Sequence, residues 1–338
     1  MGKVPAMNTT THQKPKILVA RAIFPEALAQ LEQSFEVQSN QADKVLSSVE
    51  LQKALSGVEG ALVTGSERID SAALSGAKNL KIVANISVGY NNFDVPAISS
   101  AGVMATNTPD VLTNTTADFG FALLMATARR ITESEHWIRA GKWDQWSIVH
   151  NPLGMDLHGS TLGIIGMGRI GQGIAKRALG FGMQVIYHNR SRLPEADEKA
   201  CGARYVSKED LLRTADHVIL VLPYSADNHH TIGAKEIALM KPTATLVNIA
   251  RGGIVDDAAL AAALKAGTIF AAGLDVFEGE PKVHPDLLKL SNVVLAPHIA
   301  SATEKTRRAM VDLAIENLRA ALAGKRPPSL INAEVFKT

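Results

Sequence analysis

The stretch Thr161-Leu-Gly-Ile-Ile-Gly166-Met-Gly168-Arg-Ile-Gly171 decides the fold of this 338-residue chain. An apolar run leads into three glycines with the spacing Gly166-x-Gly168-x-x-Gly171. In a strand–turn–helix unit the first glycine permits the tight turn, and the second lets the backbone approach a pyrophosphate. The third lets helix and strand pack closely. The helix N-terminus then offers free N–H groups to the anion. This stretch therefore predicts a dinucleotide-binding unit.

Apolar runs of strand length alternate with helical patterns along the rest of the chain. After residue 160, six runs are predicted strands: 161–165, 184–187, 217–222, 245–249, 271–276 and 292–295. Before it, four runs are predicted strands: 16–20, 60–64, 81–85 and 103–106. Residues 26–35, 49–56, 115–140 and 302–322 have helical patterns, the third of them as one long helix. Strands that alternate with helices form parallel sheets, so the chain is predicted to be α/β.

Composition narrows the class of protein. The chain carries 35 Lys and Arg against 33 Asp and Glu, a net charge of +2, which argues against nucleic acid or a membrane as a partner. It has no run of about 18 apolar residues, and its first 16 residues lack the apolar segment of a signal peptide. The single cysteine, Cys201, excludes an intramolecular disulfide and a multi-cysteine zinc site. We expect a cytoplasmic protein with a disordered tail at 1–15 and no metal site.

The residues after the second strand of this unit indicate the cofactor. Enzymes that use NAD place an acidic residue on the ribose 2′-hydroxyl here, but this chain has Asn189-Arg190-Ser191-Arg192. Asn189 removes the carboxylate that would repel a 2′-phosphate. The two guanidinium groups and the Ser191 hydroxyl can bind that phosphate. The alternative is a basic surface loop. We expect NADP(H) to be preferred, with NAD(H) possible.

Three segments follow the ends of predicted strands, where open α/β sheets bind ligands. They are Asn248-Ile-Ala-Arg251-Gly-Gly, Leu274-Asp275-Val-Phe-Glu278-Gly-Glu280-Pro and Pro297-His298-Ile-Ala300-Ser-Ala-Thr. With the glycine loop, they make the chain resemble the D-isomer-specific 2-hydroxyacid dehydrogenases over nearly all of residues 16–333. Within that family it is most similar to the glyoxylate/hydroxypyruvate and 2-ketogluconate reductases. The resemblance implies that Arg251, Glu280 and His298 are the catalytic trio.

The chemistry of these side chains suits that assignment. Arg251 can hold a substrate carboxylate and polarise a carbonyl while staying charged. His298 is the natural proton donor because histidine titrates near working pH. Glu280 beside it would favour the imidazolium. By resemblance, Asp275 faces the nicotinamide, whereas Glu278 is expected to be solvated. The other nine histidines are interpreted as surface or packing residues.

The resemblance also assigns binding residues. In the first domain, the backbone N–H groups of Val88 and Gly89 would bind the substrate carboxylate, although an ordinary strand-to-helix turn is the alternative. Trp146, in the arm 141–158, is predicted to reach the site of a neighbouring subunit, with packing in a dimer core as the alternative. We expect a homodimer formed through the cofactor domain and this arm. The predicted cofactor-binding residues are Thr116, Gly166, Met167, Gly168, Arg169, Ile170, Asn189, Arg190, Ser191, Arg192, Leu222, Pro223, Ile249, Ala250, Asp275 and Ala300.

The sequence thus predicts two doubly wound parallel-sheet domains, a Rossmann-type cofactor domain inserted into a flavodoxin-like substrate domain. The cofactor domain is expected at 113–302, and the substrate domain at 16–112 plus 303–338. The expected activity is NADPH-dependent reduction of small 2-oxo acids, glyoxylate and hydroxypyruvate, to D-2-hydroxy acids, with His298 as proton donor. A 2-ketogluconate reductase is the alternative. A nucleotide-sensing interaction module, as in related corepressors, is a distant one, and the basic loop 189–192 argues against an NAD sensor.

Overall fold

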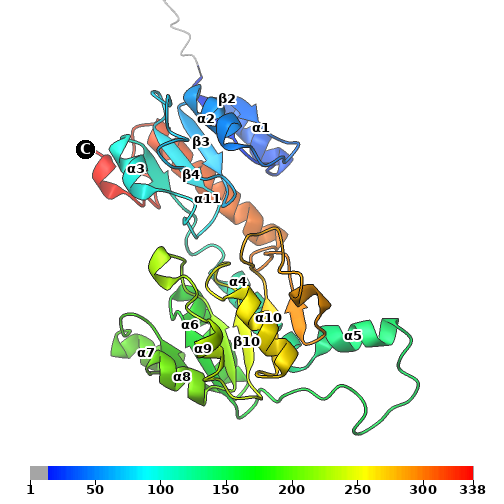
Figure 1. The fold of residues 1–338 in the computed structure, drawn as a ribbon. Coiled ribbons are helices and arrows are strands. Elements are labelled where there is room, and N and C mark those ends of the chain that lie inside the picture. The colour runs from blue at the N-terminus through cyan, green and yellow to red at the C-terminus, as the bar shows by residue number, and fades with distance from the viewer. Residues whose placement is uncertain (1–13, 338) are drawn as a thin grey trace, which may run out of the picture. The chain divides into compact units, whose positions relative to one another are not determined.

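The computed structural model describes residues 14–337, which form two compact units (Figure 1). Unit 1 comprises the chain up to Pro109 together with the chain from Arg307 onward, and unit 2 comprises Asp110–Thr306. Residues 1–13 of the predicted tail lie outside the described residues. Among the residues that are described, no helix is both long enough and apolar enough to cross a membrane.

Unit 1 contains a five-stranded parallel sheet with the order β2-β1-β3-β4-β5. Its strands are β1 (Lys16–Val19), β2 (Glu36–Ser39), β3 (Gly60–Val63), β4 (Ile82–Asn85) and β5 (Met104–Thr106). Its helices are α1 (Pro25–Ser34), α2 (Ser48–Ser56), α3 (Val95–Ser100) and α11 (Glu304–Leu322), which enters the unit at Arg307. Alternate side chains of β1 enter two separate cores. Ile17 packs with α1 and α11 on one face of the sheet, and Leu18 packs with α2 and α3 on the other. This is the flavodoxin-like doubly wound order.

Unit 2 contains a seven-stranded parallel sheet with the order β12-β11-β10-β9-β6-β7-β8. Its strands are β6 (Thr161–Ile165), β7 (Gln184–His188), β8 (Ala203–Tyr205), β9 (His217–Leu220), β10 (Thr245–Asn248), β11 (Ala271–Leu274) and β12 (Val293–Leu295). Its helices are α4 (Thr113–Ala128), α5 (Ile131–Arg139), α6 (Arg169–Gly180), α7 (Glu195–Cys201), α8 (Lys208–Thr214), α9 (Ala234–Ile237) and α10 (Asp257–Ala266). The direction of strand progression reverses between β6 and β9, as in the Rossmann fold. The predicted fold class is therefore confirmed for both units.

The central strands of unit 2 are apolar because both faces of the sheet are covered. One core lies between the sheet and the helices α4 and α6, and the other between the sheet and α8, α9 and α10. Two short strands, β2 and β8, were not predicted. Both are edge strands, with sequences Glu-Val-Gln-Ser and Ala-Arg-Tyr, and neither has a continuous apolar run. An edge strand that faces solvent needs no such run.

The single long helix predicted over 115–140 is wrong. The helix ends at Ala128, and a second one, α5, begins at Ile131. The carbonyl of Ala128 accepts the N–H of Met155, and Arg130 takes a left-handed conformation with φ 53°. The Arg130 guanidinium is bound by both carboxylate oxygens of Glu133, each at 2.7 Å. The break therefore depends on a contact with Met155, 27 residues after Ala128 in the chain, which helical spacing cannot reveal.

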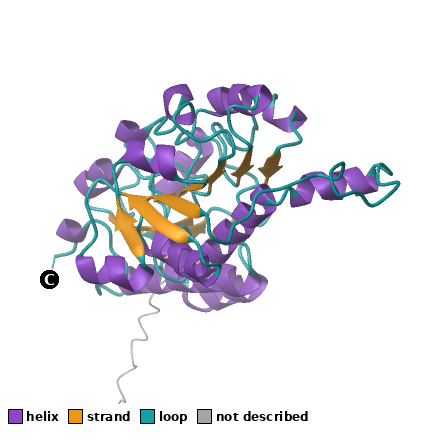
Figure 2. Ribbon diagram, turned by 90° about the horizontal axis from the view of Figure 1, so that it is seen from below, coloured by secondary structure: helices purple, strands orange, loops and turns teal. Residues whose placement is uncertain are grey.

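After α5, a long loop leads back to β6, and α5 and this loop project from unit 2 (Figures 1 and 2). No residue of α5 is buried in the described chain. The loop exposes large apolar side chains, among them Trp146 at 73% and Ile148 at 74%. Such a contiguous set of exposed apolar side chains is typical of an interaction surface.

Candidate active site

The loop between β6 and α6 has the backbone that a pyrophosphate site needs. Gly166 has φ 104°, and a Cβ there would lie 2.7 Å from the backbone nitrogen of Leu222. A Cβ at Gly171 would collide with the carbonyl oxygen of Gly166. At Gly168, by contrast, a Cβ would meet no described protein atom within 4 Å. The first and third glycines are therefore required by the protein itself, whereas the second leaves open space beside the loop.

The start of α6 fits an anion in that space. Gly168 is the N-cap and makes no side-chain cap, so the N–H groups of the first turn have no partner from a capping side chain. Arg169 lies in this turn and forms an ion pair with Asp110 at 2.8 Å. The N–H of Met167 donates to Oδ1 of Asn189 at 2.7 Å, which ties the loop to the end of β7.

One buried hydroxyl near this loop lacks a partner. Thr116 lies on α4, the helix that packs against α6, where a Cβ at Gly173 would lie 3.0 Å from Ala117. Oγ1 of Thr116 has no hydrogen-bond partner within residues 14–337. A buried hydroxyl without a partner is costly, and a bound ligand could supply one. Together with the open side of Gly168, this atom fits a dinucleotide.

The basic loop after β7 is organised by Glu198. The carboxylate of Glu198 accepts from Arg192 Nε at 2.8 Å, from Arg192 Nη2 at 2.7 Å and from the Tyr187 hydroxyl at 2.6 Å. The hydrogen bonds from Arg192 and Tyr187 lower the pKa of Glu198 to about 2, and burial with the Glu198 contact raises that of Tyr187 to about 12. Arg190 and Ser191 are exposed. Arg192 is thus already paired with a carboxylate, which the sequence did not reveal.

His298 and Glu280 form the centre of the candidate active site. His298 Nδ1 lies 2.8 Å from Oε2 of Glu280, and the other Glu280 oxygen accepts the N–H of Phe277 at 3.1 Å. Their side chains are 46% and 32% exposed, so the pair is accessible to a small molecule. Burial alone would raise the pKa of Glu280. The hydrogen bond and charge of His298, the Phe277 N–H and the Arg251 charge together lower it.

Asp275 shapes the segment that carries His298. Its two carboxylate oxygens accept the N–H groups of Ile299 at 2.7 Å and Ala300 at 2.9 Å, and its carbonyl accepts the N–H of His298. His298 has φ 55°, a conformation that is strained for a residue other than glycine. These three bonds hold the strained turn in place. Burial raises the pKa of Asp275, and its backbone bonds oppose that change.

Arg251 follows β10 and is partly buried. Burial lowers the pKa of Arg251, while the charges of Glu280 and Asp275 act in the opposite direction. Its turn is held by Asn248, whose side chain accepts the N–H of Ala250 at 3.0 Å and donates to the Arg251 carbonyl at 3.2 Å. Unit 2 therefore places all three predicted catalytic residues on turns after neighbouring strands. Asn248 was missed, although a polar residue at the end of a buried strand was a usable signal.

The remaining predicted residues have these positions. Leu222 and Pro223 follow β9, and Ile249 and Ala250, both buried, follow β10. Ile170 lies in the first turn of α6. Val88 and Gly89 lie in unit 1 after β4. Asn107 donates to the Val88 carbonyl at 2.8 Å, and Asn85 donates to the Gly89 carbonyl at 3.0 Å, so both carbonyls are fixed.

Comparison with known proteins defines the class. Residues 121–300 match the family described as D-isomer specific 2-hydroxyacid dehydrogenase, NAD binding domain. A glyoxylate reductase from Thermococcus kodakarensis is 47% identical over 327 residues, which cover 96% of this chain and 98% of that protein. The site and fold thus define an NAD(P)-dependent oxidoreductase.

Solved structures agree with this class. An NADPH-dependent glyoxylate/hydroxypyruvate reductase from Sinorhizobium meliloti, in complex with NADP and malonate, superimposes with a TM-score of 0.85 at 34% identity. The match covers 96% of this chain and 99% of that one. A glyoxylate reductase from Paecilomyes thermophila has a TM-score of 0.85 at 33% identity, covering 95% and 99% of the two chains. This chain belongs to the D-isomer specific 2-hydroxyacid dehydrogenase family, as its motifs predicted.

Proposed function

We propose that the chain reduces small 2-oxo acids, with glyoxylate and hydroxypyruvate as preferred substrates, to D-2-hydroxy acids with NADPH. The observation that carries this proposal is the 2.8 Å contact between His298 and Glu280 in a site that also contains Arg251. Glyoxylate reductases match this chain over nearly their whole length, and this similarity supports the choice of substrate. We assign Arg251, Glu280 and His298 as the catalytic residues.

Each residue of the trio has a defined role in this proposal. When bound, a reduced nicotinamide cofactor would supply the hydride that the carbonyl carbon of the 2-oxo acid accepts. The Arg251 guanidinium pairs with the substrate carboxylate and polarises the carbonyl. Glu280 holds Nδ1 of His298 through its Oε2, so Nε2 is the ring nitrogen left to donate a proton to the carbonyl oxygen. In the oxidative direction, the neutral imidazole accepts that proton.

We also assign residues that bind the cofactor and further residues that bind the substrate. In this proposal unit 2 binds the cofactor, and the Val88 and Gly89 N–H groups of unit 1 bind the substrate carboxylate. Asn85 and Asn107 support this assignment because they hold the neighbouring carbonyl groups in fixed positions. The N–H groups of the α6 first turn would hold the pyrophosphate, and Thr116 would contact the cofactor.

The preference for NADPH rests on loop 189–192. Asn189 brings no negative charge that would repel a 2′-phosphate. Arg190 is exposed, so its guanidinium is accessible to that phosphate. The Sinorhizobium meliloti relative was solved with NADP, which agrees with this choice for a similar chain. We expect NADH to be used less efficiently.

We further propose a homodimer in which the arm 141–158 covers the partner, and in which Trp146 reaches the partner's site. The exposed apolar side chains of the arm support this assembly. Trp146→Ala should change the ratio of catalytic efficiencies for glyoxylate and hydroxypyruvate while the dimer stays intact. An intact dimer with an unchanged ratio would refute the role of Trp146.

The proposed activity is tested by following the oxidation of NADPH and NADH with glyoxylate, hydroxypyruvate and 2-ketogluconate. The expected result is rapid NADPH oxidation with the first two acids. A preference for 2-ketogluconate would change the assigned substrate, and turnover with none of the three acids would overturn the proposal. His298→Gln should lower turnover by orders of magnitude but keep NADPH binding. His136→Gln, on an exposed face of α5, is the matched control.

A further inference from the structure

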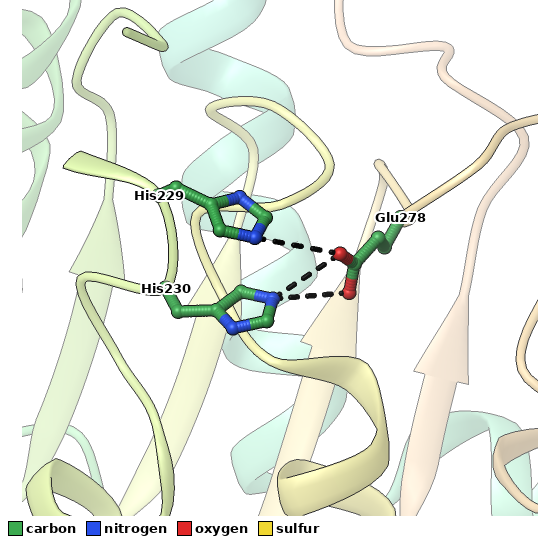
Figure 3. A group of neighbouring side chains, drawn as sticks. All are labelled: His229, His230 and Glu278. Carbon is green, nitrogen blue, oxygen red and sulfur yellow. Dashed lines mark hydrogen bonds and ion pairs between the residues drawn. The ribbon is translucent and has the colours of Figure 1, made fainter. Parts of the chain in front are cut away.

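Outside the catalytic trio, two histidines and a glutamate of unit 2 converge (Figure 3). His229 and His230 lie in the loop after β9, and Glu278 lies in the loop after β11. His230 Nε2 is 3.2 Å from each oxygen of Glu278, and His229 Nε2 is 3.8 Å from one of them. One ligand atom from each residue lies within 4.8 Å of the other two.

We propose that His229, His230 and Glu278 bind a divalent transition-metal ion of the Zn²⁺ type, with water as the fourth ligand. Two imidazole nitrogens and one carboxylate oxygen form a donor set that zinc accepts. Ligand atoms about 2.0–2.1 Å from a tetrahedral ion lie about 3.3 Å from one another. The two His–Glu distances, 3.2 and 3.8 Å, bracket that value, and all three ligand atoms lie within 4.8 Å of one another, so the side chains would have to draw together around the ion.

The outer ring nitrogens give the strongest support for this proposal. Nδ1 of His229 lies 3.2 Å from the hydroxyl of Tyr224, within hydrogen-bond distance, whereas Nδ1 of His230 lies 3.9 Å from a carboxylate oxygen of Asp256, which is an ion-pair distance and too long for a hydrogen bond. Metal-binding histidines usually donate the other ring N–H to an acceptor of this kind, which fixes the tautomer and turns the free nitrogen to the ion. Here both Nε2 atoms face Glu278 (Figure 3).

The backbone around the cluster is fixed before any ion binds. The N–H of Glu278 donates to the buried Asp257 carboxylate at 3.0 Å, and the N–H of His230 donates to the Gly253 carbonyl at 2.7 Å. His230 has φ 52°, a strained conformation for this residue type. Gly253 has no side chain, and a Cβ there would lie 3.1 Å from both His229 and Tyr224. The loop geometry thus makes room for the two stacked rings.

The simpler interpretation is a hydrogen-bonded surface cluster. A hydrogen bond to Glu278 explains the orientation of the His230 ring, because His230 Nε2 lies 3.2 Å from the carboxylate. It does not explain the orientation of the His229 ring, because His229 Nε2 lies 3.8 Å from the carboxylate, which is too far for a hydrogen bond. The two rings stack with centroids 3.8 Å apart. An ion between the three groups would explain why both Nε2 atoms face the same carboxylate.

A bound ion would connect two loops of the candidate active site. One ligand, Glu278, lies two residues before Glu280, and the other two follow the segment of Leu222 and Pro223. The ion would therefore restrain the loop that carries Glu280 without taking part in the chemistry. Its effect is expected on thermal stability and on metal content, independently of turnover.

The test uses the untagged full chain, freed of metal with a chelator and then titrated with Zn²⁺ or, as a hard-ion control, Mg²⁺. We expect one Zn²⁺ per chain by equilibrium dialysis, a higher Tm with Zn²⁺ and no response to Mg²⁺. Co²⁺ in the same site should show the visible absorption of a tetrahedral ion.

Three single substitutions locate the site: His229→Asn, His230→Asn and Glu278→Gln. All three side chains are 34–43% exposed, so the metal-free Tm should change little. Each substitution should weaken Zn²⁺ binding by at least about tenfold, since each removes one side chain that would bind the ion directly. His136→Asn, an exposed histidine of α5 beside Glu135, should leave binding unchanged. Two outcomes would overturn the proposal. One is that the wild-type chain binds no stoichiometric Zn²⁺, and the other is that all three variants bind Zn²⁺ as tightly as the wild-type chain.

Discussion

Glu280 and His298 are 18 residues apart in the chain, yet Oε2 of the first lies 2.8 Å from Nδ1 of the second. They meet because β11 and β12 are adjacent parallel strands whose following turns lie at the same edge of the sheet. Asp275, directly after β11, fixes the turn after β12 through two backbone N–H groups. One loop thus provides the carboxylate and also positions its partner.

This relationship predicts unequal effects in the pair. His298→Gln removes the proposed proton donor and should lower kcat by about 10²–10⁴-fold. Glu280→Gln keeps the shape but removes the charge, so the loss should be smaller. The double substitution should cost about as much as His298→Gln alone, because the two residues act as a unit. Steady-state kinetics with NADPH binding as a control test this, and additive losses would show that Glu280 acts independently.

The contacts of loop 189–192 predict different roles for Arg190 and Arg192. Both arginines are exposed, but Arg192 is bound by both oxygens of Glu198, and Arg190 is not bound by that carboxylate. A charged hydrogen bond contributes about 1.5–3 kcal/mol, so Arg190→Ala should lower the efficiency with NADPH by about tenfold or more, and leave NADH unaffected. Arg192→Ala should have the smaller effect on cofactor preference and a larger one on Tm.

Glu198 provides the complementary variant. Glu198→Gln removes the charge that holds Arg192, and this should release the guanidinium toward a 2′-phosphate and increase the NADPH-to-NADH ratio. Arg213→Ala, on α8 and paired with Glu209, is the matched surface control. A ratio that falls in Glu198→Gln would mean that Glu198 orients Arg192 for the phosphate instead of competing with it.

Burial of His217 predicts a pH dependence of stability. Burial lowers the pKa of His217 from its usual value of 6.5, and the ring lies between Thr245 Oγ1 at 2.8 Å and the Asp156 carbonyl at 3.2 Å. The unfolded chain therefore takes up this proton at higher pH than the folded chain. The contribution is fully present above pH 6.5 and is lost as the pH falls through the folded-state pKa.

Urea midpoints of the wild type and of His217→Gln, measured between pH 7.5 and pH 5 in steps of about half a unit, test this dependence. The variant should be less stable at pH 7.5, because it loses a packed ring, but it should lose less on acidification. Comparing the slopes removes the contributions of the carboxylates that both chains share. Parallel slopes would mean that His217 does not titrate differently on folding.

The sequence predicted what depends on local backbone geometry and missed what depends on neighbours distant in the chain. The glycine loop and the central strands were recognisable because their requirements lie within a few residues. By contrast, the end of α4 depends on Met155, and the pairing of Arg192 depends on Glu198. His229 and His230 were interpreted as surface or packing residues because their partner, Glu278, lies about 50 residues later.

The last prediction separates the two roles of glycine in the phosphate loop. A Cβ at Gly166 would lie 2.7 Å from backbone atoms of Val221 and Leu222, at φ 104°, so Gly166→Ala should lower the Tm as well as NADPH affinity. At Gly168 the φ is −79° and no described atom lies within 4 Å of the added Cβ. Gly168→Ala should therefore keep the Tm of the free chain but lose NADPH binding, because the methyl group would occupy the space for the pyrophosphate. Thermal melts with and without NADPH distinguish the two variants. If Gly168→Ala retained a full NADPH-dependent rise in Tm, the pyrophosphate would have to bind away from this loop.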